Sequence, residues 1–156
     1  MLVAGWLALK DNYQWLDFGD GRQAIAPEWL KIAAQRGIHE IRVFTSDVGD
    51  IPIGVVGLGN VNHHFKSATL WVVLGDKLQS GRGYASRAVS KMLTLGFDNL
   101  GLYSINTWIV EHNPSIRVAE RVRFRPIGRQ RQCHAIDGRL YDRLLFDLLA
   151  SEHEEI

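Results

Sequence analysis

The stretch between residues 68 and 112 constrains the fold of this chain most strongly. Residues 68–76 form an aliphatic run that ends in a turn containing Gly81 and Gly83, which predicts a strand followed by a break. The segment 83–98 then repeats apolar residues at steps of three and four, as an amphipathic helix does. Residues 103–112 are rich in β-branched and aromatic side chains and predict a second strand. Because such crossovers are right-handed and join neighbours, we expect a β-α-β unit with two adjacent parallel strands.

The remaining elements surround this unit with antiparallel strands. Asp137-Gly138 is a strong hairpin signal within residues 125–149. We therefore expect the α/β (α+β) class: one mixed, mostly antiparallel, twisted sheet around the central parallel β-α-β unit, with helices on both faces. Other predicted segments are the helices 26–37 and 113–124 and the strands 39–47 and 51–62.

Composition sets the class of protein. The 156 residues are 46% hydrophobic and 22% charged, which predicts a single domain spanning residues 1–156. A net charge of +1 argues against nucleic-acid and membrane partners. The single cysteine, Cys133, excludes an intramolecular disulfide and a cysteine zinc site. Residues 1–12 lack the basic start of a signal peptide, so we expect a cytoplasmic protein.

The glycine turn predicts an anion site. A helix that begins after glycines presents unpaired N–H groups at the positive end of its dipole, where a phosphate binds well. Arg82 and Arg87 would add positive charge. The stretch lacks the lysine of a P-loop and the third glycine of a Rossmann turn, since Ser86 occupies that position. From the residues alone, a phosphate site and a merely tight turn stay equally open.

Two motifs resemble the GNAT family of N-acetyltransferases. "SGRGYASRAV" resembles motif A, Gln/Arg-x-x-Gly-x-Gly/Ala, in which Gly83 and Ala85 match the last two positions. "NPSIRVAERVRFRPIG" resembles the next helix and strand of the family, in its ribosomal-protein N-terminal acetyltransferase type. The resemblance covers roughly residues 51–149. It implies the acyl-CoA N-acyltransferase fold, in which the two parallel strands splay apart.

The resemblance also implies acetyl-CoA as co-substrate and a set of residues that bind it. The Gln/Arg position of motif A falls on Ser80, with Gln79 one residue earlier. The diphosphate would lie on the N–H groups of the turn, the pantetheine arm on the first splayed strand, and Asn113 beside the arm. The implied cofactor-binding residues are Val72, Val73, Leu74, Gln79, Ser80, Gly81, Arg82, Gly83, Tyr84, Ala85 and Asn113.

The implied function is direct transfer of an acetyl group from acetyl-CoA to a primary amine: a protein N-terminus, an amino sugar or a small amine. Ala119 stands where many relatives have a catalytic tyrosine, so Ser115 is the candidate acid for the thiol, or else a helix cap. Glu111 is the candidate base, and other titratable side chains stay open for that role. Those others are His63, His64, His112 and His134.

The missing tyrosine, together with the absence of a glutamate on the first splayed strand, leaves a non-catalytic CoA- or nucleotide-binding module as the alternative. We expect no metal, because adjacent His63 and His64 point to opposite sides of a strand. Trp71 and Trp108 are expected in the core. A homodimer is one possibility for the assembly.

Arginines crowd residues 117–131, and three interpretations stay open: a solvated surface, a nucleic-acid site, or a local site for the CoA phosphate or an acidic substrate. The near-neutral net charge favours a solvated surface or a local site. Arg117 and Arg121 are the members expected to face a ligand.

Overall fold

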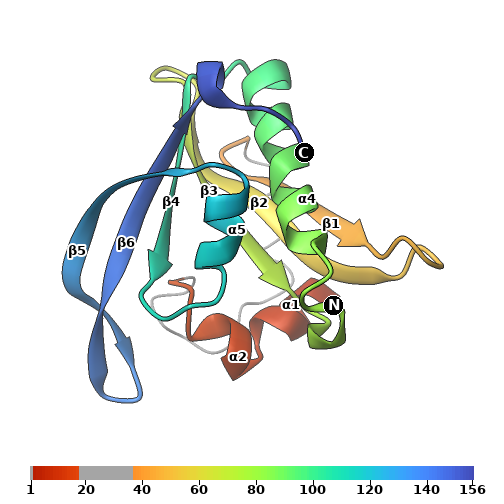
Figure 1. Cartoon of the computed structure of the whole chain (residues 1–156), viewed down its shortest axis with the longest axis vertical. Coiled ribbons are helices and arrows are strands. Elements are labelled where there is room, and N and C mark those ends of the chain that lie inside the picture. Colours follow the sequence, from red (N-terminus) through yellow and green to blue (C-terminus); the bar gives the residue numbers. More distant parts are fainter. Residues whose placement is uncertain (1, 18–36) are drawn as a thin grey trace.

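The computed structural model describes residues 2–17 and 37–156, so the helix predicted over residues 26–37 lies almost wholly outside the described residues. Within them, six strands form one sheet in the order β1-β2-β3-β4-β6-β5 (Figure 1). Their bounds are β1 Glu40–Thr45, β2 Pro52–Asn62, β3 Ser67–Leu74, β4 Ser104–Val110, β5 Arg125–Ile136 and β6 Arg139–Leu149.

The sheet is mixed and mostly antiparallel, as predicted. Of the six strands described, only β3 and β4 run parallel, and the crossover helix of the expected β-α-β unit joins them. Their register covers only Ser67↔Ser104, Ala68↔Ile105 and Thr69↔Asn106. Beyond these pairs the two strands separate, while β3 stays paired to β2 as far as Leu74. The splay implied by the family resemblance is therefore present.

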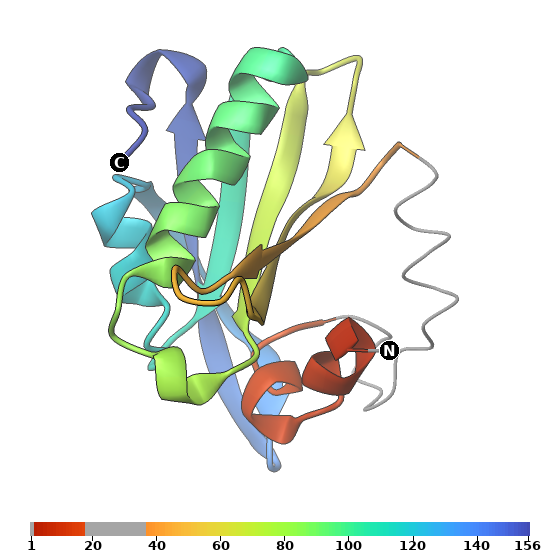
Figure 2. The ribbon, with the colours of Figure 1, turned by 90° about the vertical axis from the view of Figure 1, so that its right-hand side faces the viewer.

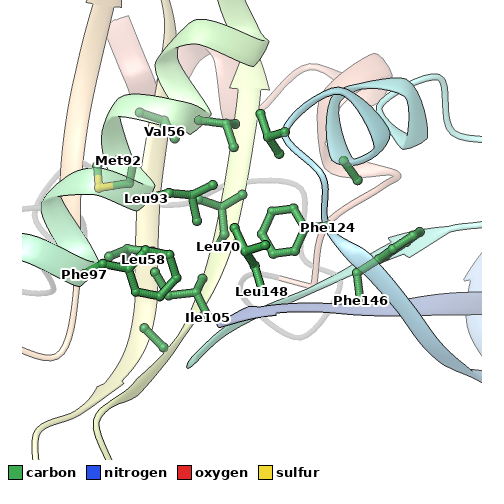
Figure 3. Packing of buried hydrophobic residues seen from close by; sticks show 14 of the residues in the cluster. Val56, Leu58, Leu70, Met92, Leu93, Phe97, Ile105, Phe124, Phe146 and Leu148 are labelled. Carbon is green, nitrogen blue, oxygen red and sulfur yellow. The ribbon is translucent and has the colours of Figure 1, made fainter. Parts of the chain in front are cut away.

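One face of the sheet carries the crossover helix α4 (Tyr84–Thr94) and the short helix α5 (Ile116–Arg121), and most of the core lies beneath them (Figures 2 and 3). A π-helical turn over Leu95–Asn99 continues α4, where a continuous helix was expected. A Cβ on Gly96 in this turn would lie 2.8 Å from Ile105, so glycine lets the helix end pack directly on the sheet. The residues that Figure 3 labels are Val56, Leu58, Leu70, Met92, Leu93, Phe97, Ile105, Phe124, Phe146 and Leu148.

The opposite face carries two short helices, α1 (Leu2–Leu7) and α2 (Lys10–Tyr13), which the sequence did not predict (Figure 2). Trp6 and Leu7 pack there on Val55 and Val73. A Cβ on Gly75 would lie 2.1 Å from the indole of Trp6, so the glycine makes room for that ring. Helices this short show no recognisable period, which explains why pattern analysis missed them. Helices therefore lie on both faces, as expected.

The predicted hairpin joins β5 and β6 at Asp137 and Gly138, whose φ angles of 50° and 78° are those of a type I′ turn. Register shifts between Pro126 and Gly128, and again between Gln130 and His134, bend β5 along its length. None of the helices in residues 2–17 and 37–156 has the length and apolar character required to cross a bilayer.

Candidate active site

A cavity of about 1110 Å³ opens where β3 and β4 separate. Its walls include Leu70–Leu74 of β3 and Thr107–Ile109 of β4, and it extends to the glycine turn, to both helix starts and to the amino-terminal segment. The hydroxyl of Thr107 donates a hydrogen bond of 2.9 Å to the carbonyl of Leu70, across the point where the strands part. Since β4 pairs with β3 only up to Thr69, the side of β3 that faces β4 is open along this cavity.

The turn that precedes α4 presents unpaired N–H groups to the cavity. A 3₁₀ turn over Lys77–Gln79 comes first, capped by Asp76, whose carboxylate accepts from the N–H of Leu78 at 3.0 Å. Gly81 and Gly83 follow with φ of 78° and 79°, and Gly83 is the N-cap of α4. Within the described parts of the chain, the N–H groups of residues 81–83 make no hydrogen bond, and those of the first helical turn have no partner inside the helix.

Two arginines from α5 complete this corner. Arg117 and Arg121 both line the cavity, and a Cβ on Gly83 would lie 3.2 Å from Nη1 of Arg121. Arg87 is directed elsewhere: its guanidinium pairs with Asp47 at 3.0 Å, and this hydrogen bond raises the pKa of Arg87. Positive charge at the glycine turn therefore comes from α5 rather than from Arg87.

Asn113 and Ser115 stand at the start of α5 on the cavity wall. Oδ1 of Asn113 accepts from the N–H of Ser115 at 2.9 Å and so closes a turn just before the helix. Ser115 occupies the N-cap position, yet its hydroxyl makes no capping hydrogen bond. The interpretation of Ser115 as a side-chain cap is therefore not supported, and its role as an acid stays a prediction. Ala119, at the position of the family tyrosine, is buried and only 3% exposed.

Glu111, the candidate base, lies away from the cavity wall. Its carboxylate accepts from Nη1 of Arg129 at 2.9 Å, and the same nitrogen contacts Asp142 at 2.9 Å. The hydrogen bond to Arg129 also lowers the pKa of Asp142. Arg82 is likewise not among the cavity-lining residues, whereas the other cofactor-binding residues predicted from the sequence all are.

The histidines that the sequence left open as bases are engaged elsewhere in the fold. His112 stands edge-on to Tyr141 at 6.2 Å between ring centroids, and His64 stands edge-on to Phe65. His63 lies 3.0 Å from the carbonyl of Gly37. Among residues 2–17 and 37–156, no three His, Cys, Asp or Glu side chains gather as they would around a metal ion.

Contacts to the β5–β6 hairpin and to β6 hold the amino-terminal segment against the cavity. Lys10 pairs with Asp137 at 2.8 Å, and Asp17 lies 3.6 Å from Arg143. His134 links both sides: Nδ1 lies 3.0 Å from Nη2 of Arg143, and Nε2 lies 2.6 Å from the carbonyl of Gln14. Because an arginine only donates, Nδ1 accepts, and Nε2 carries the proton that it donates to Gln14.

A second part of the cavity, here called the acceptor wall, consists of Asp11, Trp15, Asp17, Trp71 and Trp108. On β4, Ile105 and Ile109 face the main core, so Trp108 between them faces the side of the sheet that carries α1 and α2. The guanidinium of Arg143 lies 3.8 Å from the centre of the Trp108 ring. Trp71 packs against the core cluster around Trp6, as expected of a core residue, but Trp71 and Trp108 are both only half-buried and line the cavity. Alternation along a strand predicts on which face of the sheet a side chain lies, but it does not predict which face borders a cavity.

Comparison with known proteins places the chain in a family. Residues 5–125 match the family model described as an acetyltransferase (GNAT) domain. An uncharacterized N-acetyltransferase p20 of Bacillus licheniformis is 32% identical over 105 residues, which are 67% of this chain and 58% of that protein. The chain therefore spans less than two thirds of the length of this curated relative.

Solved structures share the fold. A dodecameric spermidine N-acetyltransferase from Vibrio cholerae superposes with a TM-score of 0.71 at 23% identity, over 80% of this chain and 72% of that one. A probable acetyltransferase gives a TM-score of 0.72 at 24% identity, over 81% and 70%. The ribosomal-protein type expected from the sequence is not confirmed by these relatives. With its splayed strands and glycine turn, the chain belongs to the GNAT acetyltransferase family.

Proposed function

We propose that this protein transfers the acetyl group of acetyl-CoA directly to a primary amine of a small molecule. The observation that carries this proposal is the cavity between β3 and β4, which runs from an open strand edge to a glycine turn with unpaired N–H groups. A thioester with a long amide-bearing arm and a diphosphate matches both features.

The residues of the cavity suit acetyl-CoA. The N–H groups of residues 81–85 suit the diphosphate, because a helix start favours negative charge, and Arg121 adds a cation beside Gly83. The main chain of Val72, Val73 and Leu74 pairs with β2 on one side only, so its other side suits the amides of the pantetheine arm. Asn113 and Ser115 line the same cavity at the start of α5.

The chemistry assigns different tasks to main chain and side chains. N–H groups on the open side of β3 would polarise the thioester carbonyl, as oxyanion donors do. The hydroxyl of Ser115, which caps no helix, would supply the proton that the departing thiolate takes up. Acetyl-CoA itself brings the activated acyl group. Cys133 is absent from the cavity wall, which supports transfer without a covalent enzyme intermediate.

The acceptor wall supports a small cationic amine as the second substrate. Asp11 and Asp17 suit an ammonium charge, and Trp15 and Trp71 suit a cation or an alkyl chain, whereas the guanidinium of Arg143 already lies over the Trp108 ring. The spermidine N-acetyltransferases that share the fold act on such an amine. A protein N-terminus is less suited, because the amino-terminal segment, which supplies three residues of this wall, is held in place by Lys10–Asp137 and Gln14–His134.

The test is acetyl transfer with the purified chain. Acetyl-CoA would be incubated with a polyamine, an amino sugar or a peptide bearing a free N-terminus, and both free thiol and the mass of the acetylated amine would be measured. Thiol release that depends on the polyamine supports the proposal. Preferential acetylation of the peptide would replace the small amine by a protein N-terminus.

The absence of a tyrosine at Ala119 keeps the non-catalytic module as the second candidate. Tight CoA binding without turnover of any amine would establish that alternative and overturn the enzyme.

A further inference from the structure

The acceptor wall takes Asp11, Trp15 and Asp17 from residues 10–17, a segment here called the strap. The strap includes α2 and follows α1 in the chain. The other members of the wall belong to β3 and β4. The geometry of the acceptor wall therefore depends on the contacts that hold the strap against the sheet.

Three of these contacts are exposed, long or without direction. Nζ of Lys10 lies 2.8 Å from a carboxylate oxygen of Asp137, but more than half of each side chain is exposed, and such ion pairs contribute little in water. Asp17 is also more than half exposed and lies 3.6 Å from Arg143. Leu16 packs on the core cluster around α1, and apolar contacts have no preferred direction. These contacts alone do not fix the orientation of the strap.

A buried histidine of β5 makes a more directional contact. His134 is 7% exposed, and its Nε2 lies 2.6 Å from the carbonyl oxygen of Gln14 in the strap. Its Nδ1 lies 3.0 Å from Nη2 and 3.3 Å from Nε of Arg143. A guanidinium only donates, so Nδ1 accepts, and Nε2 carries the proton that is donated to Gln14. Hydrogen bonds that are shielded from water in this way are stronger than exposed ones.

Arg143 is held firmly on the sheet. Its guanidinium lies 3.8 Å from the centre of the Trp108 ring, and only 16% of its side chain is exposed. The residue belongs to β6, where Val110 of β4 lies opposite it. A guanidinium that is stacked and largely buried has little room to move. A change at Nδ1 of His134 therefore displaces the imidazole rather than Arg143.

A proton added to His134 is incompatible with this arrangement. A cationic imidazole carries a proton on both nitrogens, so its Nδ1–H would point at the N–H groups of Arg143, with two positive charges in contact. Because the ring is rigid, an imidazole that turns away from Arg143 also withdraws Nε2 from the carbonyl of Gln14. The added proton therefore breaks the buried contact between the strap and the sheet.

The other titratable groups around His134 do not remove this conflict. Tyr141 of β6 lies opposite His134 in the sheet and is uncharged near neutral pH. The carboxylate of Asp17 is engaged with the same guanidinium, and Asp137 pairs with Lys10. In the described parts of the chain, no carboxylate forms an ion pair with His134 that would stabilise a cationic ring.

We infer that His134 is a positioning residue of the acceptor wall, an inference that rests on the proposed function. The neutral imidazole holds the strap, and with it Asp11, Trp15 and Asp17, in the position that suits the amine. The protonated imidazole leaves Arg143 and releases the strap. Amine binding therefore weakens in mildly acidic solution, where imidazoles gain a proton, while the glycine turn and β3 keep their arrangement for acetyl-CoA.

The first test compares the wild type with His134→Gln and His64→Gln. A glutamine amide offers the same acceptor and donor as the neutral imidazole but takes up no proton. His64 is exposed and lies outside the cavity, so its variant is the control. KM would be measured between about pH 5.5 and pH 8 for a polyamine at saturating acetyl-CoA, and for acetyl-CoA at saturating polyamine.

Acidification also protonates the amine itself, so the decisive quantity is the ratio of the amine KM of the wild type to that of His134→Gln at each pH. We expect this ratio to rise on acidification by up to about tenfold per pH unit, the limit for one linked proton. The corresponding ratio for acetyl-CoA should stay constant, and His64→Gln should follow the wild type. An amine ratio that does not change with pH would overturn the inference.

Hydrogen exchange followed by mass spectrometry tests the strap itself without any substrate. Acidification slows the chemistry of exchange for all amides alike, so the exchange of residues 10–17 is divided by that of α1 in the same sample. Helix α1 is the internal reference, because Trp6 and Leu7 are buried. This quotient should rise in the wild type as the pH falls and stay constant in His134→Gln. A constant quotient in the wild type would refute the inference, and that result needs no folded variant.

The two measurements separate this inference from the proposed function. If the wild type acetylates no amine, the proposed function fails, and the exchange of the strap still decides whether His134 holds it. If the amine is acetylated but its KM ratio is independent of pH, the proposed function stands and the role of His134 fails.

Discussion

At the scale of single residues, Gly83 has two properties that matter: its backbone has a positive φ angle, and its missing side chain leaves space where a ligand is proposed to bind. Its φ of 79° suits glycine, and any side chain there would meet Arg121. Gly101 has a comparable φ of 66°, but a Cβ on it would meet nothing within 4 Å, and it lies off the cavity. Both glycines therefore have a positive φ angle, but only Gly83 has a neighbouring side chain and a place on the cavity wall.

We expect Gly83→Ala to weaken CoA binding, because the methyl group intrudes where the N–H groups and Arg121 converge. Gly101→Ala should leave CoA affinity unchanged. Both variants should lose about 1–2 kcal/mol of unfolding free energy, the cost of a left-handed conformation without glycine. Calorimetric titration with CoA and chemical denaturation measure the two effects. Equal CoA affinities in the two variants would contradict the assignment of the turn.

Alanine variants of Ser115 and Asn113 distinguish a role in catalysis from a role in helix stability. Ser115→Ala should lower kcat while CoA affinity and stability stay close to the wild type, since the hydroxyl caps nothing. Asn113→Ala should instead lower the unfolding free energy by about 1 kcal/mol, because the turn before α5 loses its side-chain hydrogen bond to the N–H of Ser115. Steady-state kinetics and thermal unfolding distinguish them. A stability loss without a rate loss in Ser115→Ala would remove Ser115 from the mechanism.

At the scale of elements, the β5–β6 hairpin holds the amino-terminal segment, and that segment lines one side of the cavity. His134 is 7% exposed and bonds both to Gln14 and to Arg143 of β6. This single side chain therefore couples α2 to the sheet. Two glycines leave space for aromatic rings that pack on this face of the sheet: Gly75 for Trp6 and Gly57 for Trp71.

We expect His134→Phe to raise KM for the amine several-fold without changing KM for acetyl-CoA. The ring keeps its volume, but the carbonyl of Gln14 and the guanidinium of Arg143 lose a partner. The unfolding free energy should fall by about 1–3 kcal/mol, the cost of leaving such groups unsatisfied. Separate titration of the two substrates tests this prediction. A rise in KM for acetyl-CoA alone would show that the segment belongs to the cofactor side.

At the scale of the whole molecule, the carboxyl-terminal residues return to α4 and fasten it. Nε2 of His153 lies 2.8 Å from the hydroxyl of Thr94, and the N–H of Ile156 donates to Ser90 at 3.0 Å. The ring of His153 also packs against Phe97, with centroids 5.5 Å apart. Burial lowers the pKa of His153 below 6.5, although Asp98 and Glu155 act in the opposite direction.

This shift predicts a dependence of stability on pH. The unfolded chain binds a proton on His153 at a pH where the folded chain does not, so stability rises with pH in that range. The contribution is fully present above about pH 6.5 and is lost as the pH falls towards the lower folded pKa. His39 contributes with the same sign. Chemical denaturation between pH 5 and 8 should show a shallower slope for His153→Gln than for the wild type. The same slope in both would refute this account, and His64→Gln is the control.

Much of the architecture could be predicted from the sequence. The β-α-β unit, the Asp137-Gly138 hairpin and the mixed sheet are confirmed, because each rests on a local period or turn preference. Membership of the GNAT family is confirmed as well, whereas the ribosomal-protein type is not. The short helices α1 and α2 were not predicted, since each has too few residues to show a helical period.

The candidate site divides in the same way. The glycine turn was visible in the sequence because its residues are contiguous and their positive φ angles favour glycine. Isolated cavity residues such as Asp11, Asp17 and His39 carried no signal in the sequence, since none of them stands in a recognisable motif. Glu111 was a candidate as a titratable group expected near the cleft, but Arg129 binds its carboxylate. Such pairings depend on strand register and bulges rather than on neighbours in the chain.

The sequence by itself determined the elements and the turn that begins α4, because backbone preferences and apolar periodicity act over a few residues. Only the tertiary structure decided which side chains share the cavity. The contacts of Gln14 with His134 and of Asp17 with Arg143 join residues more than a hundred positions apart. Preferences that act over a few neighbouring residues cannot predict such contacts. The divergence of β3 from β4 after Thr69, which opens the cavity, is likewise a property of the whole sheet.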